Sequence, residues 1–327
     1  MKKCSADRNA EPAEVIQSTI ESLAGLICDK QQRRPRNLNE ILQDVYADIF
    51  GETEDLSLTT GISALDNLLD GIEPGDLITI AAGTGVGKTA FALQVMKHMA
   101  KKGKKIMLYS QEMSDKQNAI RMLARESGVD LYKLKKSGRL DEAEVKKVEE
   151  AFNGLHKMPI EIMDLSGITV EDIRLDCVSD KDLDCIFVDH VGLMRLPKGV
   201  RASSRNDEIT KLMTELRALA LQIRKPVIVL SQFNREAMKK PEPDLQCLRD
   251  GGEIEQSSSA VILLWRTPDY DTDGTIGVKV AKNRQGAPGK FYMKFDAPRM
   301  SFAEVTSYMP KSNWKLADKK EIQEVFG

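Results

Sequence analysis

From residue 61 onward, hydrophobic positions fall into short continuous runs that alternate with segments of helical periodicity. The runs cover residues 77–81, 105–110, 159–163, 185–189 and 226–232, and the clearest helical segments are residues 89–102 and 208–223. Uninterrupted apolar runs are typical of strands buried on both faces, and helices between strands are typical of parallel pairing. The pattern therefore predicts an α/β fold with a mostly parallel central sheet and helices on both faces.

Three further apolar runs follow without helices between them, at residues 260–265, 276–283 and 290–295. Strands joined without a helical crossover pair antiparallel, so we expect these runs to extend the sheet in that way. The runs together predict one α/β domain over residues 59–305. A C-terminal tail over residues 306–327, which contains Trp314, then follows.

Residues 1–58 have a different pattern, with two short amphipathic segments and a linker. Apolar positions recur at helical spacing from Pro12 to Gln32. They recur again from Asn37, a residue type that favours helix N-caps, to Phe50. Two interpretations are open: these helices pack on the main domain, or they dock on a neighbouring subunit.

The composition limits the functions that fit this chain. Lys and Arg total 48 against 50 Asp and Glu, which gives a net charge of −2. This balance excludes a protein that binds nucleic acid through a uniformly basic surface, so any such contact needs a local basic patch. Aromatic residues make up only 5% of the chain. Base stacking is therefore not expected to dominate a nucleic-acid contact.

The cysteines and the apolar runs bear on where the protein works. The five cysteines show no C-x-x-C spacing, so neither a disulfide framework nor a zinc site is predicted. No apolar run is long enough to cross a membrane, and the basic start lacks the apolar region of a signal peptide. We expect a cytoplasmic protein, in a bacterium or in the host of a phage that encodes it.

The strongest chemical signal is AAGTGVGKTA, which follows the first strand and opens a helix. It fits the phosphate-binding loop of nucleotide hydrolases, with Ala82 in the leading glycine position. Its glycines let main-chain N–H groups face phosphate oxygens, Lys88 reaches the β- and γ-phosphates, and the Thr89 hydroxyl ligates Mg²⁺. The predicted ligands are ATP and Mg²⁺. The predicted contacts are Gly83, Thr84, Gly85, Val86, Gly87, Lys88, Thr89 and Ala90.

Two acidic residues follow other predicted strands. Asp189 ends the apolar run CIFVD, and Glu112 follows the run KIMLYS. Ligands of open parallel sheets lie at the carboxyl ends of the strands, so both carboxylates should meet Lys88 at one edge. We expect Asp189 to support the metal and Glu112 to orient the attacking water.

Several blocks together resemble the ATPase domain of the DnaB family of replicative DNA helicases, within the RecA-like fold. The matching blocks are residues 59–93, 109–140, 186–194, 225–266 and 280–295. Other RecA-like ATPases share the first block, whereas the combination of QEMS, RDGGEIEQ and AKNRQG is typical of this family. The resemblance does not extend to the family's helical N-terminal collar domain, since residues 11–50 resemble only its end and the linker helix.

The resemblance implies further roles for individual residues. Gln232, at the end of the run PVIVLSQ, would sense the γ-phosphate. Lys282 and Arg284 resemble the pair that reaches the ATP of the neighbouring subunit; without the resemblance they could equally form surface salt bridges. His190 stands where the family usually has an aromatic residue, and we interpret it as a packing residue.

DNA contact in this family comes from loops that face a central channel. The first candidate is the loop of residues 195–205, whose cations suit a phosphate backbone. The second is the segment LRDGGEIEQ, which falls at the family's strand-gripping positions. The predicted DNA-binding residues are Arg195, Lys198, Arg201, Arg205, Arg249, Asp250 and Gly252.

The leading hypothesis is an ATP-driven hexameric helicase that moves 5′ to 3′ on single-stranded DNA and unwinds forked duplex. The resemblance implies a homo-hexamer with ATP at subunit interfaces, and a primase or a helicase loader as further partners. One alternative is a RecA-like recombinase or recombination mediator that forms filaments, because a head-to-tail subunit contact can close into a ring or continue as a helix. Another is a nucleotide-regulated assembly module with negligible turnover.

Overall fold

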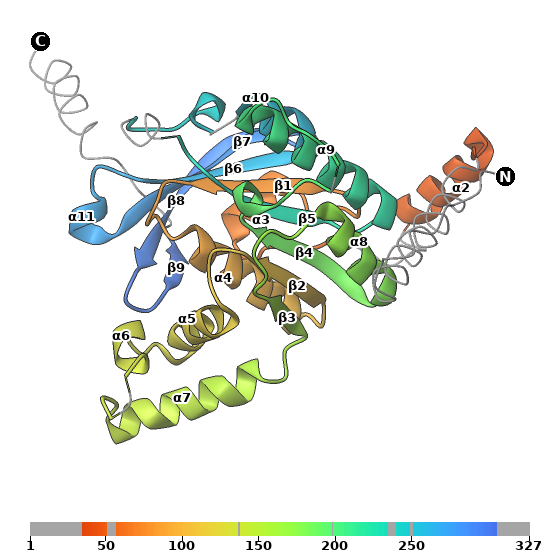
Figure 1. Ribbon diagram of the computed structural model, residues 1–327. Helices are drawn as coiled ribbons and strands as arrows, with labels where there is room; N and C mark the ends of the chain where they lie inside the picture. Colours follow the sequence, from red (N-terminus) through yellow and green to blue (C-terminus); the bar gives the residue numbers. More distant parts are fainter. Residues whose placement is uncertain are drawn as a thin grey trace, which may run out of the picture.

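The computed structural model describes residues 35–50, 57–136, 138–197, 199–234, 240–248 and 251–305. Its centre is a nine-stranded sheet in the order β3–β2–β4–β5–β1–β6–β7–β8–β9 (Figure 1). The strands are β1 (Leu77–Ala82), β2 (Lys105–Ser110), β3 (Ile160–Met163), β4 (Leu183–Asp189), β5 (Val227–Gln232), β6 (Ala260–Arg266), β7 (Thr275–Asn283), β8 (Gly289–Asp296) and β9 (Ser301–Glu304). Every strand predicted above is confirmed, and β9 is an addition.

Strand direction also follows the prediction. The pairs from β3 to β6 are parallel. The later strands β7, β8 and β9 pair antiparallel, so the C-terminal runs extend the sheet as expected. The α/β class with a mostly parallel sheet is confirmed.

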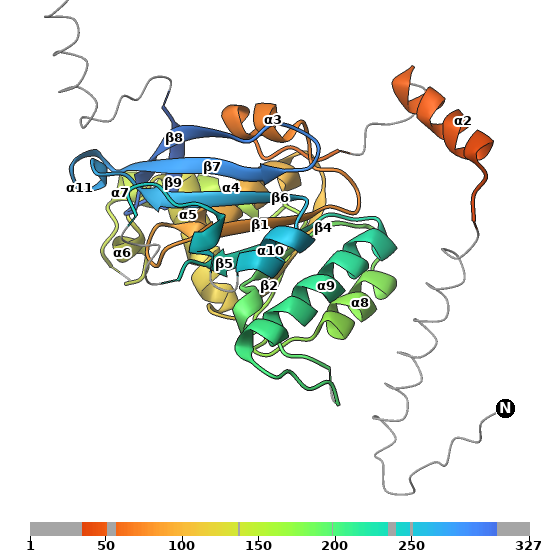
Figure 2. The same cartoon turned by 90° about the horizontal axis from the view of Figure 1, so that it is seen from above.

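Helices cover both faces of the sheet. They are α3 (Ser63–Leu69), α4 (Lys88–Lys101), α5 (Asp115–Ser127), α6 (Leu131–Leu134), α7 (Glu142–Leu155), α8 (Val170–Ser179), α9 (Arg205–Ile223), α10 (Gly251–Ser257) and α11 (Tyr270–Asp273), with short 3₁₀ turns η1 (Val191–Leu193) and η3 (Leu245–Cys247). The layer of α8, α9 and α10 lies on one face, with α8 beside α9, and α3 and α4 lie on the other (Figures 1 and 2).

Alternate residues of β1 show why its sequence is continuously apolar. Ile78 and Ile80 pack in the core shared with α3 and α4. Leu77 and Ala81 pack in the second core with α8 and α9. Because successive side chains point to opposite faces, a strand between two helical layers has no position for a polar residue facing water.

The helix predicted from Asn37 is confirmed as α2 (Leu38–Ile49). The Asn37 side chain accepts hydrogen bonds from the N–H groups of Asn39 and Glu40, at 2.7 and 3.3 Å, and so caps the helix. The apolar face of α2 is exposed, with Leu38 and Ile49 at 70% and 71%. The helix predicted over Pro12–Gln32 and the C-terminal tail lie outside the described residues.

The carboxyl ends of four strands meet at one edge of the sheet. Ala82, the last residue of β1, pairs with Gln232, the last residue of β5. Ser110 at the end of β2 pairs with Asp189 at the end of β4. The segments that follow these strands carry most of the chemistry predicted from the sequence, so this edge holds the candidate site.

Candidate nucleotide-binding and catalytic site

The loop between β1 and α4, residues 83–87, forms one wall of a cleft at this edge. Gly85 and Gly87 have φ angles of 75° and 102°, a backbone conformation that glycine adopts without steric cost. A Cβ atom at Gly87 would lie 2.9 Å from the rings of Phe295 and Phe302, so a larger residue would collide there. The loop and the N-terminus of α4 form the arrangement that binds phosphate groups.

Nearly all of the predicted phosphate-binding residues line this cleft. They are Gly83, Thr84, Gly85, Gly87, Lys88, Thr89 and Ala90. Val86 differs, because its side chain is buried in the core on the α4 side. Any contact of Val86 with a nucleotide would therefore be made by its main chain.

Lys88, Thr89 and Asp189 meet at the base of the cleft. The Thr89 hydroxyl donates a 2.6 Å hydrogen bond to Oδ2 of Asp189. Lys88 Nζ lies 3.5 Å from Oδ1 of the same carboxylate, and the two side chains are 8% and 0% exposed. Residues separated by about a hundred positions in sequence thus form one charged cluster.

Two of these buried atoms lack hydrogen-bond partners within the described residues, namely Lys88 Nζ and Asp189 Oδ1. A buried polar atom without a hydrogen bond costs about 1–3 kcal/mol, so the cluster favours a ligand that supplies partners. A phosphate oxygen suits the ammonium group of Lys88. A divalent cation suits the carboxylate of Asp189 and the hydroxyl of Thr89, which are the oxygen donors that Mg²⁺ takes.

Glu112 and Gln232 line the same cleft from the ends of β2 and β5. Glu112 is exposed on the turn that precedes α5. That turn is held by the buried Asn118, whose amide donates to Ser110 Oγ at 2.8 Å and to the Ser114 carbonyl at 3.1 Å. The carboxylate predicted to orient water therefore lies on a braced turn beside the phosphate loop.

Sequence reasoning missed several residues of the cleft. Arg121 of α5 lines it; burial lowers the pKa of its guanidinium, while the carboxylates of Asp189 and Glu112 oppose that shift. Phe295 and Met300 form an apolar part of the wall. The only signal for Arg121 was a cation nine positions after the candidate acid, and periodicity alone gave no reason to place it at the site.

Lys282 and Arg284 lie at the opposite edge of the sheet. Asn283 pairs with Ala260, the first residue of β6, whereas Leu264 of β6 pairs with Ala82 beside the phosphate loop. Four residues of strand separate the two positions by roughly 13 Å at about 3.3 Å per residue. Lys282 Nζ donates to the Ser258 carbonyl at 2.9 Å, and Arg284 donates to the Gln256 carbonyl at 2.7 Å.

The candidate DNA-binding residues are only partly described. Arg195, Arg201 and Arg205 are exposed on the segment that follows β4. Gly252 is exposed in the first turn of α10, which packs against α9. Both candidate segments thus lie near each other, beside the phosphate loop's edge of the sheet. Lys198, Arg249 and Asp250 lie outside the described residues.

His190 does more than pack. Its Nδ1 accepts a 3.1 Å hydrogen bond from the Gly192 N–H, and its ring lines a small cavity with Arg205 and Gln232. In the part of the chain that the structure describes, no helix has the length and apolar character needed to cross a membrane.

Comparison with known proteins agrees with this geometry. The family model of the DnaB-like helicase C-terminal domain matches residues 57–304. The replicative DNA helicase DnaC of Bacillus subtilis (strain 168) is 29% identical over 298 residues, which are 86% of this chain and 65% of that protein. The replicative DNA helicase DnaB of Geobacillus stearothermophilus is 31% identical over 274 residues, or 80% of this chain and 60% of that protein. The chain thus spans less than two thirds of the length of these relatives.

Solved structures give the same result. One of them, an isolated ATPase domain, superposes with a TM-score of 0.74 and 26% identity, covering 83% of this chain and all of that one. A DnaB-like replicative helicase, studied with its interactions with primase, superposes with a TM-score of 0.72 and 25% identity, covering 89% of this chain and 72% of that one. The resemblance drawn from the sequence blocks is confirmed, and the chain belongs to the family of the DnaB-like helicase C-terminal domain.

Proposed function

We propose that this chain is the motor of an ATP-dependent replicative DNA helicase. The observation that carries the proposal is the cluster of Lys88, Thr89 and Asp189 at the base of a cleft with Glu112 on its rim. Binding without turnover would need the cation and the phosphate loop alone. The additional acid on the rim of the same cleft favours an enzyme over a regulated assembly module.

The chain's own side chains divide the work of hydrolysis. Lys88 holds the β- and γ-phosphates, and Glu112 orients the attacking water and accepts its proton. Gln232 contacts the γ-phosphate and detects its loss. Mg²⁺ held by Thr89 and Asp189 would neutralise charge on the phosphate oxygens. The apolar wall of Phe295 and Met300 offers a surface for the base of the nucleotide.

We place the ATP between two subunits of a hexameric ring. Lys282 and Arg284 lie at the edge of the sheet away from their own cleft, so they are positioned to serve a neighbour's cleft. A cation that enters from another subunit stabilises charge in the transition state and is worth about 10³–10⁵ in rate in GTPases. Hydrolysis would then depend on assembly.

The exposed face of α2 supports the same arrangement. Leu38, Leu42 and Ile49 are 54–71% exposed in a single chain. An apolar groove of about 430 Å³ lies between α5 and α7, lined by Ile120, Leu123 and Phe152 among others. We propose that α2 of one subunit occupies this groove on the next, which supports the interpretation that the N-terminal helices dock on a neighbour.

DNA would pass through the ring, against the segments that carry Arg195, Arg201, Arg205 and Gly252. A ring repeats these modest basic patches around one strand, which reconciles DNA binding with a net charge of −2. We propose movement in the 5′ to 3′ direction, exclusion of the other strand, and action in the bacterial or host cytoplasm. A primase or a loader is a proposed further partner.

The test is strand displacement on forked duplexes that carry only a 5′ or only a 3′ loading tail, with ATP and Mg²⁺. We expect displacement only with the 5′ tail, and none by the Lys88→Ala variant. Hydrolysis stimulated by single strands without any displacement would favour the recombinase. Hydrolysis and displacement both absent from the assembled wild-type protein would contradict the proposal.

A further inference from the structure

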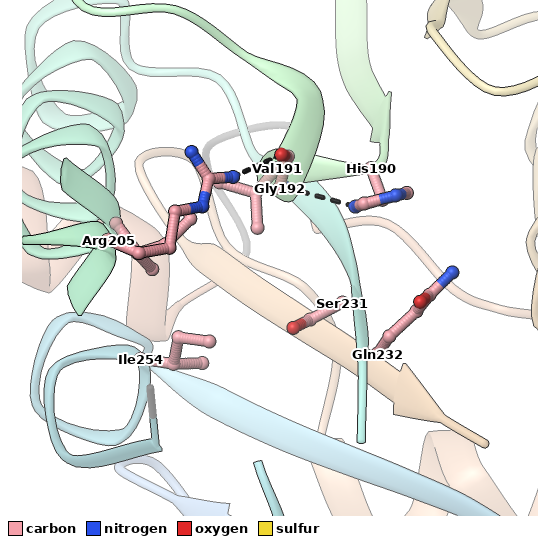
Figure 3. A pocket seen from close by; sticks show the side chains of 8 residues that line it. His190, Val191, Gly192, Arg205, Ser231, Gln232 and Ile254 are labelled. Carbon is pink, nitrogen blue, oxygen red and sulfur yellow. Dashed lines mark hydrogen bonds between the residues drawn. The ribbon is translucent and has the colours of Figure 1, made fainter. Parts of the chain in front are cut away.

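A small cavity lies between the nucleotide cleft and the segment that carries the candidate DNA-binding arginines. Its lining includes His190, Gly192, Arg205, Ser231, Gln232 and Ile254, which come from the ends of β4 and β5 and from α9 and α10 (Figure 3). Gln232 also lines the nucleotide cleft. The cavity of about 50 Å³ has room for ordered water, so the side chains around it have space to move.

Gly192 in the turn η1 is held on both sides of its backbone. Its N–H donates to His190 Nδ1 at 3.1 Å, and its carbonyl accepts a hydrogen bond from Nη2 of Arg205 (Figure 3). A Cβ atom at Gly192 would lie 2.8 Å from the His190 ring, so the close approach needs glycine. Arg205 therefore grips the turn that directly follows Asp189 and His190.

The grip of Arg205 is one that a DNA phosphate can replace. Its other nitrogen, Nη1, forms an ion pair with Glu208 one turn along α9. The two side chains are 39% and 27% exposed, and partly exposed ion pairs of this kind are weak. A phosphate offers a guanidinium two charge-assisted hydrogen bonds in place of one carbonyl and one screened carboxylate.

The turn that Arg205 holds is covalently linked to the nucleotide cluster. Asp189, three residues before Gly192, accepts the Thr89 hydroxyl and lies 3.5 Å from Lys88. Asp189 must exchange these contacts when a cation and phosphates enter the cleft. A clamp on the following turn resists that exchange, because a packed backbone segment adopts discrete positions and does not deform continuously.

We propose that Arg205 is a strand-sensitive latch that couples DNA binding to ATP hydrolysis. Without DNA, the guanidinium holds the Gly192 carbonyl and restrains the Asp189 segment. A strand phosphate draws Arg205 away, and the released turn lets Asp189 adopt its hydrolytic position. The latch rests on the proposed function, and it gives Arg205 a positioning role in addition to affinity for DNA.

The test measures ATP hydrolysis without DNA and with saturating single-stranded oligonucleotide in three variants of the full chain. Arg205→Met removes the latch. Arg201→Met is the matched control, since Arg201 is an exposed arginine of the same segment and no side-chain contact with Gly192 is seen for it among the described residues. Glu208→Gln keeps the arginine but weakens the ion pair that holds it.

We expect Arg205→Met to raise the DNA-free rate several-fold and to bring the ratio of the two rates close to one at saturating DNA. Arg201→Met should raise the oligonucleotide concentration for half-maximal stimulation while keeping the ratio at saturation. Glu208→Gln should raise the DNA-free rate and lower the half-maximal concentration. These opposite effects on affinity separate a latch from a simple phosphate contact.

A wild-type ratio in Arg205→Met at saturating DNA would overturn the latch, because the residue would then serve affinity alone. An unchanged DNA-free rate in Glu208→Gln would overturn it independently, even if Arg205→Met failed to fold. Absence of hydrolysis in the wild-type chain would instead contradict the proposed function, so the two failures are distinguishable.

Discussion

The charge pair at the base of the cleft allows a quantitative prediction about stability. Replacing Lys88 by Met leaves the fully buried carboxylate of Asp189 without its counter-charge. Replacing Asp189 by Asn leaves the nearly buried ammonium group without its counter-charge. The double variant Lys88→Met with Asp189→Asn removes both charges and keeps the approximate side-chain volumes.

The size of the effect follows from the geometry. Unit charges 3.5 Å apart attract by about 5 kcal/mol at an effective dielectric constant of about 20. Removing one partner of a buried pair costs about 3–5 kcal/mol. Because the cleft is open to water above Lys88, we expect about 3 kcal/mol for each single variant and about the same for the double variant. The coupling free energy between the two sites is then about 3 kcal/mol.

Urea unfolding without nucleotide, followed by circular dichroism at one protein concentration, measures these free energies. The dependence of the unfolding free energy on urea should be the same in all four proteins, so that midpoints report stability. Single effects that simply add, with a coupling free energy below about 0.5 kcal/mol, would refute this reasoning. The two groups would then be independent in the free protein.

Further predictions concern catalysis, assembly and pH. Glu112→Gln should bind a fluorescent ATP analogue as the wild type does but release phosphate about 10²–10⁴-fold more slowly, and wild-type turnover would exclude the water-orienting role. Leu42→Asp on the exposed face of α2 should reduce the assembled fraction in light scattering without lowering the unfolding free energy of the single chain. Gln43→Asp is its charge-matched control, and equal assembly of the two would count against docking by α2. Lys279 and Lys290 lower the pKa of Glu242 below its ordinary value of 4.5, so the ionised pair stabilises the fold above that value. Glu242→Gln should therefore be less stable than the wild type at pH 7, and the difference in urea midpoint should shrink as the pH falls below about 4.5; a difference independent of pH would contradict this.

Much of the fold could be predicted because burial on both faces leaves a plain record in the sequence. The continuous apolar runs that became β1, β4 and β5 contain no alternation, and that absence specified a covered parallel sheet. The strand β9 left no such record. It has four residues at a sheet edge, only Phe302 among them is buried, and it forms because it pairs with β8.

The site was predictable where chemistry follows directly from a strand end. Lys88, Thr89 and Asp189 obey that rule, and the structure brings them into contact. Phe295 and Met300 reach the same cleft through the antiparallel extension, since β8 runs back toward the phosphate loop. That path depends on tertiary pairing, which no local pattern encodes.

The contacts of Arg205 were hidden for a related reason. Its charge suggested a DNA contact, but its partner in the free protein is a main-chain carbonyl thirteen residues earlier. Every residue carries a carbonyl, so sequence alone does not indicate which one an arginine meets. Only the packing of η1 against α9 establishes the pair.

The central claim is that two copies of this chain complete each ATP site of a DNA-driven motor. The measurement that tests it most directly mixes two variants, Glu112→Gln and Arg284→Ala, each expected to be inactive alone. In a mixed ring, some Arg284→Ala subunits keep Glu112 and receive an intact Arg284 from a Glu112→Gln neighbour. We predict that single-strand-stimulated phosphate release reappears on mixing. Two variants that stay inactive together, while light scattering shows mixed assemblies, would contradict it.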